Sequence, residues 1–146
     1  MLENMHSGMR WERALHGALG SDYEFEPPGL SIDFVRSDQR RAIELKHGLV
    51  SMRDLHAAVM QLAVAACGLP HAHLTLIAHM KRAGAPRIKE DWNQALAALQ
   101  PTIASRLSLI AFARDGDLVL PTGDDDTTEL ARLARRTDVE AQHHGT

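Results

Sequence analysis

The sequence LSIDFVRSDQRRAIELK, residues 30–46, contains two apolar stretches separated by a polar loop. Apolar and polar side chains alternate in both stretches, a pattern typical of β-strands with one buried face. The alternation places Glu44 and Lys46 on the same face of the second strand. If the two strands pair as a hairpin, Asp33 of the first strand projects from that face too. This stretch therefore predicts two carboxylates and one ammonium group close together in space.

The segments around this stretch predict a single α/β domain. Helical periodicity and turn residues predict helices at residues 7–19, 51–67, 89–105 and 127–136. Alternation and β-branched content predict strands at residues 23–26, 30–35, 42–46 and 71–79. Two apolar runs on either side of Asp115-Gly116 predict a last hairpin, with strands at residues 107–113 and 118–120. The strand, helix and strand between residues 42 and 79 predict one right-handed parallel crossover beside an antiparallel meander. The expected architecture is a mixed β-sheet flanked by helices.

The chain of 146 residues has the usual length of one domain. We expect this domain to span residues 1–137 and residues 138–146 to form a flexible tail. The one cysteine, Cys67, excludes an intramolecular disulfide and a cysteine-based zinc site. We expect Cys67 to be a small buried apolar residue, and the low cysteine content fits a reducing compartment.

The charge and hydropathy of the chain exclude two broad classes of function. The net charge is −3, which argues against a protein that coats nucleic acid through bulk positive charge, although it allows a local basic groove. The longest apolar stretch, residues 62–69, is far shorter than the roughly 18 residues that a membrane span requires. We therefore predict a cytoplasmic protein with no membrane association.

The residues Asp33, Glu44 and Lys46 suggest a specific chemistry. Paired carboxylates are typical ligands of Mg²⁺, which prefers oxygen and keeps several waters that a substrate phosphate can displace. A lysine beside such a site can orient or deprotonate the attacking water. One or two ions held there would polarise a phosphodiester and stabilise the leaving oxygen.

These residues resemble the PD-(D/E)xK nuclease superfamily, also called restriction-endonuclease-like. The resemblance rests on Asp33, the triplet Glu44-Leu45-Lys46 and the order of helices and strands between residues 11 and 79. Ile32 stands where the name of the family has proline. The resemblance implies a three-layer core and a nuclease that hydrolyses phosphodiester bonds in DNA with Mg²⁺ or Mn²⁺. It also implies that Asp33, Glu44 and the Leu45 backbone carbonyl bind the metal, and that Lys46 assists the water nucleophile.

Further site residues follow from the same resemblance. Many members add a glutamate from the first helix, for which Glu12 is the candidate, and a glutamine from the helix after the triplet, for which Gln61 is the candidate. Basic residues near the expected site are candidates for binding DNA: Arg36, Arg40, Arg41, Arg53, Lys81 and Arg82. A domain of this size has no room for a separate recognition module, so a second copy in a homodimer or a partner protein is expected to supply specificity.

Other interpretations of the same residues stay open. Glu44 and Lys46 are also compatible with the solvent-facing side of an edge strand, and Glu12 with a solvated helix flank. Gln61 is also compatible with a structural role, in which its side chain forms hydrogen bonds with backbone groups. At the level of function, the alternative is a catalytically silent protein of the nuclease fold that acts as a binding or assembly subunit. A third interpretation is an unrelated α/β protein that dimerises through its last hairpin.

Overall fold

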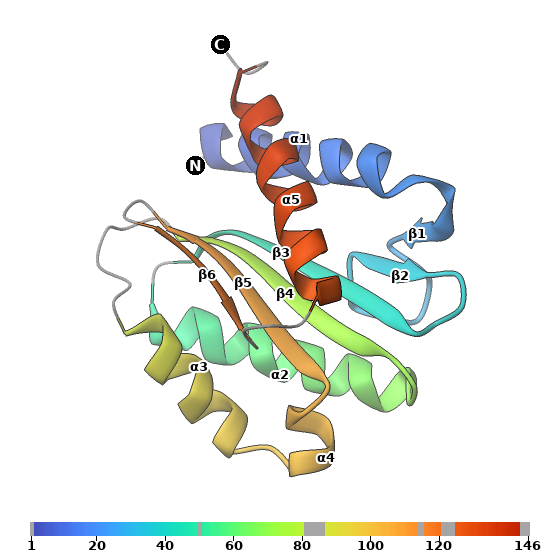
Figure 1. Cartoon of the computed structure of the whole chain (residues 1–146), viewed down its shortest axis with the longest axis vertical. Coiled ribbons are helices and arrows are strands. Elements are labelled where there is room, and N and C mark those ends of the chain that lie inside the picture. Colours follow the sequence, from blue (N-terminus) through green and yellow to red (C-terminus); the bar gives the residue numbers. More distant parts are fainter. Residues whose placement is uncertain (1, 50, 81–86, 114–115, 121–124, 144–146) are drawn as a thin grey trace.

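The computed structural model describes residues 2–49, 51–80, 87–113, 116–120 and 125–143. A six-stranded sheet lies at its centre, with helices on both faces (Figure 1). The strands are β1 (Tyr23–Phe25), β2 (Phe34–Arg36), β3 (Arg41–Leu49), β4 (His73–Met80), β5 (Leu107–Ala113) and β6 (Gly116–Leu120). The helices are α1 (Leu2–Leu19), α2 (Met52–Gly68), α3 (Ile88–Ala97), α4 (Pro101–Ala104) and α5 (Asp125–His143).

The sheet is mixed, and its strand order β1-β2-β3-β4-β5-β6 follows the chain. The strands β1, β2 and β3 pair antiparallel, as the predicted meander requires. The strands β3, β4 and β5 pair parallel, and β6 returns antiparallel beside β5. The parallel pair β3 and β4, joined through α2, confirms the predicted crossover unit. A second parallel connection, through α3 and α4, was not predicted.

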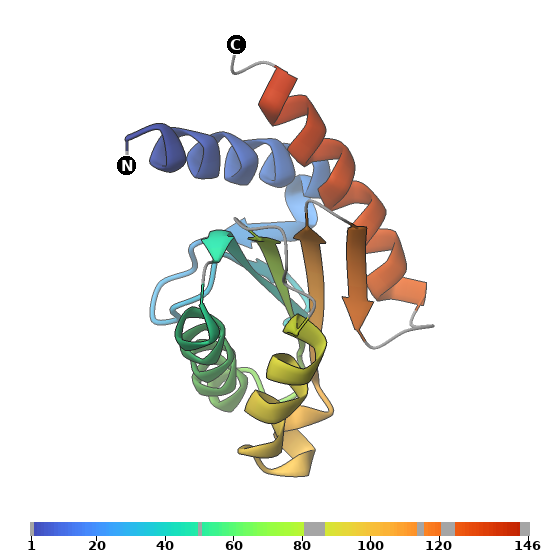
Figure 2. The same ribbon diagram turned by 90° about the vertical axis from the view of Figure 1, so that its left-hand side faces the viewer.

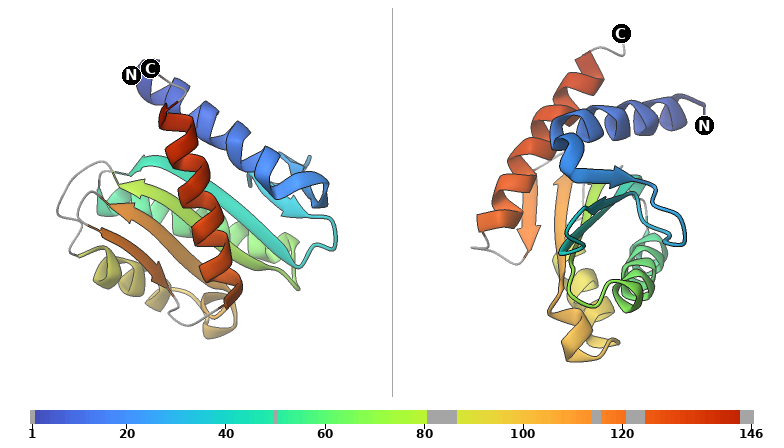
Figure 3. Two further views of the ribbon diagram at one scale, coloured as in Figure 1. Left: turned by 45° about the horizontal axis from the view of Figure 1, so that its top comes forward. Right: turned by 90° about the vertical axis from the view of Figure 1, so that its right-hand side faces the viewer.

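The helices form two layers around the sheet. Helices α1 and α5 cover one face, and helices α2, α3 and α4 cover the other (Figures 2 and 3). Two apolar clusters fill the spaces between the layers, because alternate residues of each strand point to opposite faces. On β4, for example, Leu76 belongs to the cluster beneath α2, whereas Ile77 belongs to the cluster beneath α1 and α5. This arrangement matches the predicted α/β class with a mixed sheet between helices.

Local sequence signals explain where several helices begin and end. Ser51 and Asp54 form a complete capping box at the start of α2, as their spacing predicts. Pro101 begins α4, so the predicted helix over residues 89–105 is two helices, since proline is favoured in a first helical turn and disrupts a helix interior. No helix in the described part of the chain is long and apolar enough to cross a membrane.

The last helix corrects the predicted tail. Helix α5 extends to His143, so residues 138–143 are helical, while residues 144–146 lie outside the described part. The physical reason is tertiary contact, because Ala141 packs in the apolar cluster beneath α1 and α5, and the buried Asp138 carboxylate lies 3.6 Å from His79 Nε2 of β4. Cys67 also differs from expectation, since it is exposed and its Sγ lies 3.4 Å from the Ala63 carbonyl of its own helix.

Candidate active site

Asp33 lies just before β2 instead of inside a strand. The pairing of β2 and β3 ends at Phe34 opposite Ile43, so the next backbone groups need other partners. The Asp33 carboxylate supplies one of them, because its Oδ2 accepts a hydrogen bond from the Leu45 backbone N–H at 2.8 Å. The Asp33 backbone N–H in turn donates to Glu44 Oε1 at 3.0 Å. These two bonds join the end of β2 to the middle of β3.

Glu44 is a buried carboxylate beside a second acid. Its side chain is 4% exposed, and burial is the main cause that raises its pKa to about 8. A hydrogen bond with Asp33 and the negative charge of Asp33 raise the pKa of Glu44 further. Lys46 acts in the opposite direction, with its Nζ 3.3 Å from Glu44 Oε2 and its side chain 35% exposed. The structure therefore brings Asp33, Glu44 and Lys46 together. Glu44 and Lys46 share a face of β3, as the alternation predicts, whereas Asp33 contacts β3 from the loop before β2.

Glu12 reaches the same region from helix α1. Burial raises the pKa of Glu12 above its usual value, the negative charges of Asp33 and Glu26 raise it further, and the Lys46 ammonium lowers it. The charges of Asp33 and Lys46 thus act on Glu12, although Glu12 belongs to the helical layer on the other face of the sheet. This electrostatic coupling supports the predicted position of Glu12 at the edge of the site.

Glu26 is an acid of this region that the sequence analysis missed. It adopts a left-handed backbone conformation with φ of 49°, which is uncommon for a residue other than glycine. Its backbone N–H donates to the Asp33 carbonyl at 2.7 Å and so closes the loop of residues 26–33. The alternation of residues 23–26 predicts only a strand, and the signal for the loop is the Pro-Pro-Gly that follows.

Gln61 lies on α2 and faces a cavity of about 330 Å³ that Lys46 also lines. Its Nε2 donates to the Ser31 carbonyl at 2.8 Å, which ties α2 to the loop before Asp33. This bond fits the interpretation of Gln61 as a partner for backbone groups, and it also holds the loop that carries Asp33. Asp54 lines the same cavity, and the sequence analysis treated it only as part of a helix cap.

The oxygen atoms at this site fit a hard divalent cation. The Leu45 N–H faces Asp33, and a strand residue presents its N–H and its C=O to the same neighbouring strand. The Leu45 carbonyl is therefore at the same edge of β3 as the two carboxylates, where it can complete a set of three oxygens. In the part of the chain that the structure describes, no group of three or more His, Cys, Asp or Glu side chains could hold a metal ion. The remaining positions of such a cation would fall to water or substrate.

The predicted DNA-binding residues do not converge on Asp33 and Glu44. Arg36 and Arg41 line a cavity next to α5, on the opposite face of the sheet from Glu44. Arg40 is exposed in the turn before β3, and its backbone N–H donates to Asp38. Arg53 is exposed in the first turn of α2, next to Asp54, so it is the described arginine of this set nearest to the Lys46 cavity. Lys81 and Arg82 lie outside the described residues.

No family model, curated protein or solved structure matches this chain.

Proposed function

We propose that the chain is a nuclease that hydrolyses DNA phosphodiester bonds with Mg²⁺ or Mn²⁺. The observation that carries the proposal is the set of three contacts that joins Asp33, Leu45, Glu44 and Lys46 where β2 ends beside the middle of β3. Two carboxylates close together in a buried position form an unfavourable pair when both are charged, and a divalent cation removes that cost. The raised pKa of Glu44 follows mainly from its burial, with the neighbouring Asp33 carboxylate as a further cause, and a bound cation would lower it.

Each residue has a separate role in this proposal. Asp33, Glu44 and the Leu45 carbonyl would hold the metal, which when bound polarises the scissile phosphate and stabilises the leaving oxygen. The half-buried Lys46 ammonium would orient the attacking water, because it contacts Glu44 Oε2 and Lys46 also lines an open cavity. Glu12 adds negative charge at the edge of the site, and Gln61 holds the loop that positions Asp33.

The proposal predicts that the variants Glu44→Gln, Asp33→Asn and Lys46→Met each lose at least about 100-fold in Mg²⁺-dependent cleavage of DNA. The substrates are supercoiled, linear double-stranded and single-stranded DNA, with RNA as a further substrate. The measurement is the initial rate with saturating Mg²⁺ or Mn²⁺, and circular dichroism verifies that each variant is folded.

The matched control is Glu24→Gln, which removes a carboxylate from an exposed position of β1 outside the site. Glu24→Gln is expected to cleave within about twofold of the wild-type rate. Folded variants of Glu44 and Lys46 that cleave as fast as the wild type would contradict the proposed role of these residues.

A catalytically silent subunit of the same architecture is the second candidate. One observation favours it: both carboxylate oxygens of Glu44 already have partners within the chain. Oε1 accepts a hydrogen bond from the Asp33 backbone N–H, and Oε2 forms an ion pair with Lys46. Calorimetric titration with Mg²⁺ and Mn²⁺ distinguishes the two candidates. Binding that Glu44→Gln abolishes supports the nuclease, whereas no binding at concentrations of about 10 mM supports the silent subunit.

A further inference from the structure

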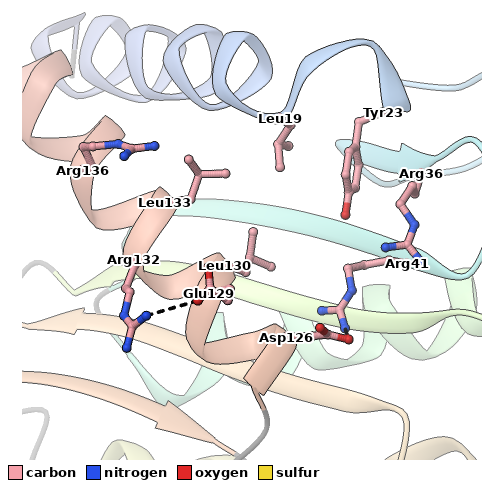
Figure 4. Close-up of a pocket in the computed structure, with 10 residues that line it drawn as sticks. All are labelled: Leu19, Tyr23, Arg36, Arg41, Asp126, Glu129, Leu130, Arg132, Leu133 and Arg136. Atoms are coloured by element: carbon pink, nitrogen blue, oxygen red, sulfur yellow. Dashed lines mark hydrogen bonds and ion pairs between the residues drawn. The ribbon is translucent and has the colours of Figure 1, made fainter.

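A second cavity lies between the start of β3 and helix α5, on the face of the sheet opposite Glu44 (Figure 4). Its volume is about 420 Å³. Four arginines line it: Arg36, Arg41, Arg132 and Arg136. Only two carboxylates, Asp126 and Glu129, face them among the residues that line the cavity. The cavity therefore carries excess positive charge in a chain with a net charge of −3.

Arg41 is the buried member of this set. It is 9% exposed, and its Nη1 is buried without a hydrogen-bond partner among the described residues. Its Nη2 lies 3.5 Å from Asp126 Oδ2, but the Asp126 side chain is 82% exposed. A guanidinium has five N–H donors, and an ion pair with an exposed carboxylate is weak. The described chain therefore gives the buried charge of Arg41 only a partial counter-charge.

Tyr23 and Arg36 add hydrogen-bond donors beside Arg41. Figure 4 shows the Tyr23 hydroxyl pointing toward the two arginines. Burial raises the pKa of Tyr23, while the charges of Arg36 and Arg41 and a hydrogen bond with Arg36 lower it, and the net change is upward. The phenol is therefore protonated at neutral pH and can donate. Arg36 also pairs with the exposed Asp38 at 3.0 Å, which holds it at the rim.

The middle of the cavity is apolar. Leu19, Leu130 and Leu133 lie between the end formed by Tyr23 and Arg41 and the arginines of α5 (Figure 4). At the far end, Arg132 pairs with Glu129 at 3.1 Å on the same helix. A ligand that fits this cavity has an anionic group at one end and an apolar body next to it.

We propose that this cavity binds a small molecule that carries a phosphate group, with the phosphate at Arg41 and Tyr23 and its apolar part over the leucines. Arginine is suited to this ligand, because its planar donors match two phosphate oxygens at once. The volume lies within the usual range of small-molecule sites. Asp126 would be displaced from Arg41 when the phosphate enters. The proposal is independent of the nuclease activity, because the cavity is on the other face of the sheet.

Isothermal titration calorimetry of the full chain in EDTA tests the proposal with three probes: inorganic phosphate, AMP and adenosine. EDTA excludes binding through a divalent cation at Glu44. AMP and phosphate are expected to bind, and adenosine, which lacks the anionic group, is not. AMP that binds at least about tenfold more tightly than phosphate shows that an organic body beside the phosphate adds affinity, whereas equal affinities identify free phosphate as the ligand.

Two variants and a control connect the binding to this cavity. Arg41→Met is expected to lower the affinity for the phosphate-bearing probes at least about tenfold. Asp126→Asn is expected to raise it severalfold, because it removes the carboxylate that competes for Arg41, and a merely structural role would not produce this gain. Arg87→Met, at an exposed position just before α3, is expected to bind like the wild type.

Three outcomes would overturn the proposal. The first is that neither phosphate nor AMP binds the wild type at about 10 mM. The second is that Arg41→Met binds them as well as the wild type does. The third is that adenosine binds as tightly as AMP, since the phosphate would then contribute nothing. If Arg41→Met fails to fold, the exposed variant Asp126→Asn still decides, because an unchanged affinity contradicts competition for Arg41.

Discussion

The two faces of β3 bury ionisable groups of opposite kind, a carboxyl group on one face and a guanidinium on the other. Toward α2, Glu44 lies beside Asp33 with Lys46 as the nearest cation. Toward α1 and α5, Arg41 lies almost fully buried with the exposed Asp126 as its partner. Only two residues separate Arg41 from Glu44 in the sequence, yet the pleat of the strand places them in different layers.

This difference gives the two faces of one strand opposite electrostatic preferences. A buried charge destabilises a fold unless a partner neutralises it, and on each face the partner within the chain is incomplete. The acidic face therefore favours a cation, and the basic face favours an anion. Both sites lower the stability of the empty protein, so variants that neutralise them should reveal the cost.

The largest effect on stability is expected from the acidic face as pH changes. The pKa of Glu44 is about 8 in the fold and near its ordinary value of 4.5 in the unfolded chain, so the folded state keeps a proton that the unfolded state loses. Without divalent cations, the contribution of Glu44 to the free energy of unfolding is therefore greatest below about pH 4.5. It decreases by on the order of a few kcal/mol as pH rises to about 8.

Urea denaturation at a series of pH values in EDTA measures this dependence. Glu44→Gln is expected to flatten it and to be more stable than the wild type at pH near 9, because the amide cannot ionise. An equal slope in the wild type and in Glu44→Gln would show that the charge on Glu44 is not what limits stability on this face.

A smaller effect is expected from Lys46. Lys46→Met removes the cation beside Glu44, so the pKa of Glu44 should rise further and the free energy of unfolding should fall by about 1 kcal/mol at pH 8 to 9. The comparison is Arg132→Met, which removes the ion pair between Arg132 and Glu129. Both side chains of this pair are 74% exposed, so its loss should lower the free energy of unfolding by less than about 0.5 kcal/mol. Equal losses in the two variants would mean that burial of Glu44 does not strengthen its ion pair.

The smallest effect is expected from Arg41. Arg41→Met replaces a poorly neutralised guanidinium by an apolar side chain and leaves Asp126 in water, so the free energy of unfolding should change by less than about 1 kcal/mol without ligand. Thermal denaturation without inorganic phosphate measures this change, and thermal denaturation with phosphate measures how much the ligand stabilises each protein. Phosphate should stabilise the wild type and leave Arg41→Met unaffected. A large loss of stability without phosphate would mean that Arg41 is mainly a structural residue.

Local patterns predicted much of the fold. Alternation located the strand around Glu44, the apolar run before the Asp-Gly turn located the strand around Leu109, and the capping box located the start of α2 at Ser51. The ends of elements were less predictable because they depend on packing. Helix α5 runs past the expected end because Asp138 and Ala141 are buried against neighbours distant in sequence. The expected strand over residues 30–35 is shorter because its Ile32 packs in the cluster beneath α2, before β2 begins.

The candidate site likewise has a part that the sequence predicts and a part that depends on tertiary packing. The sequence by itself determined that Glu44 and Lys46 share a face, because the period of a β-strand is a local property. The predicted strand begins at residue 42, so the sequence assigned no face to Arg41. Only the tertiary structure decided what each face meets. Asp33 reaches Leu45 through a loop that Glu26 closes in a left-handed conformation, and Arg41 meets a helix from the far end of the chain. These contacts form between residues that are distant in sequence, and they depend on how the whole apolar core packs. No local sequence pattern carries that information.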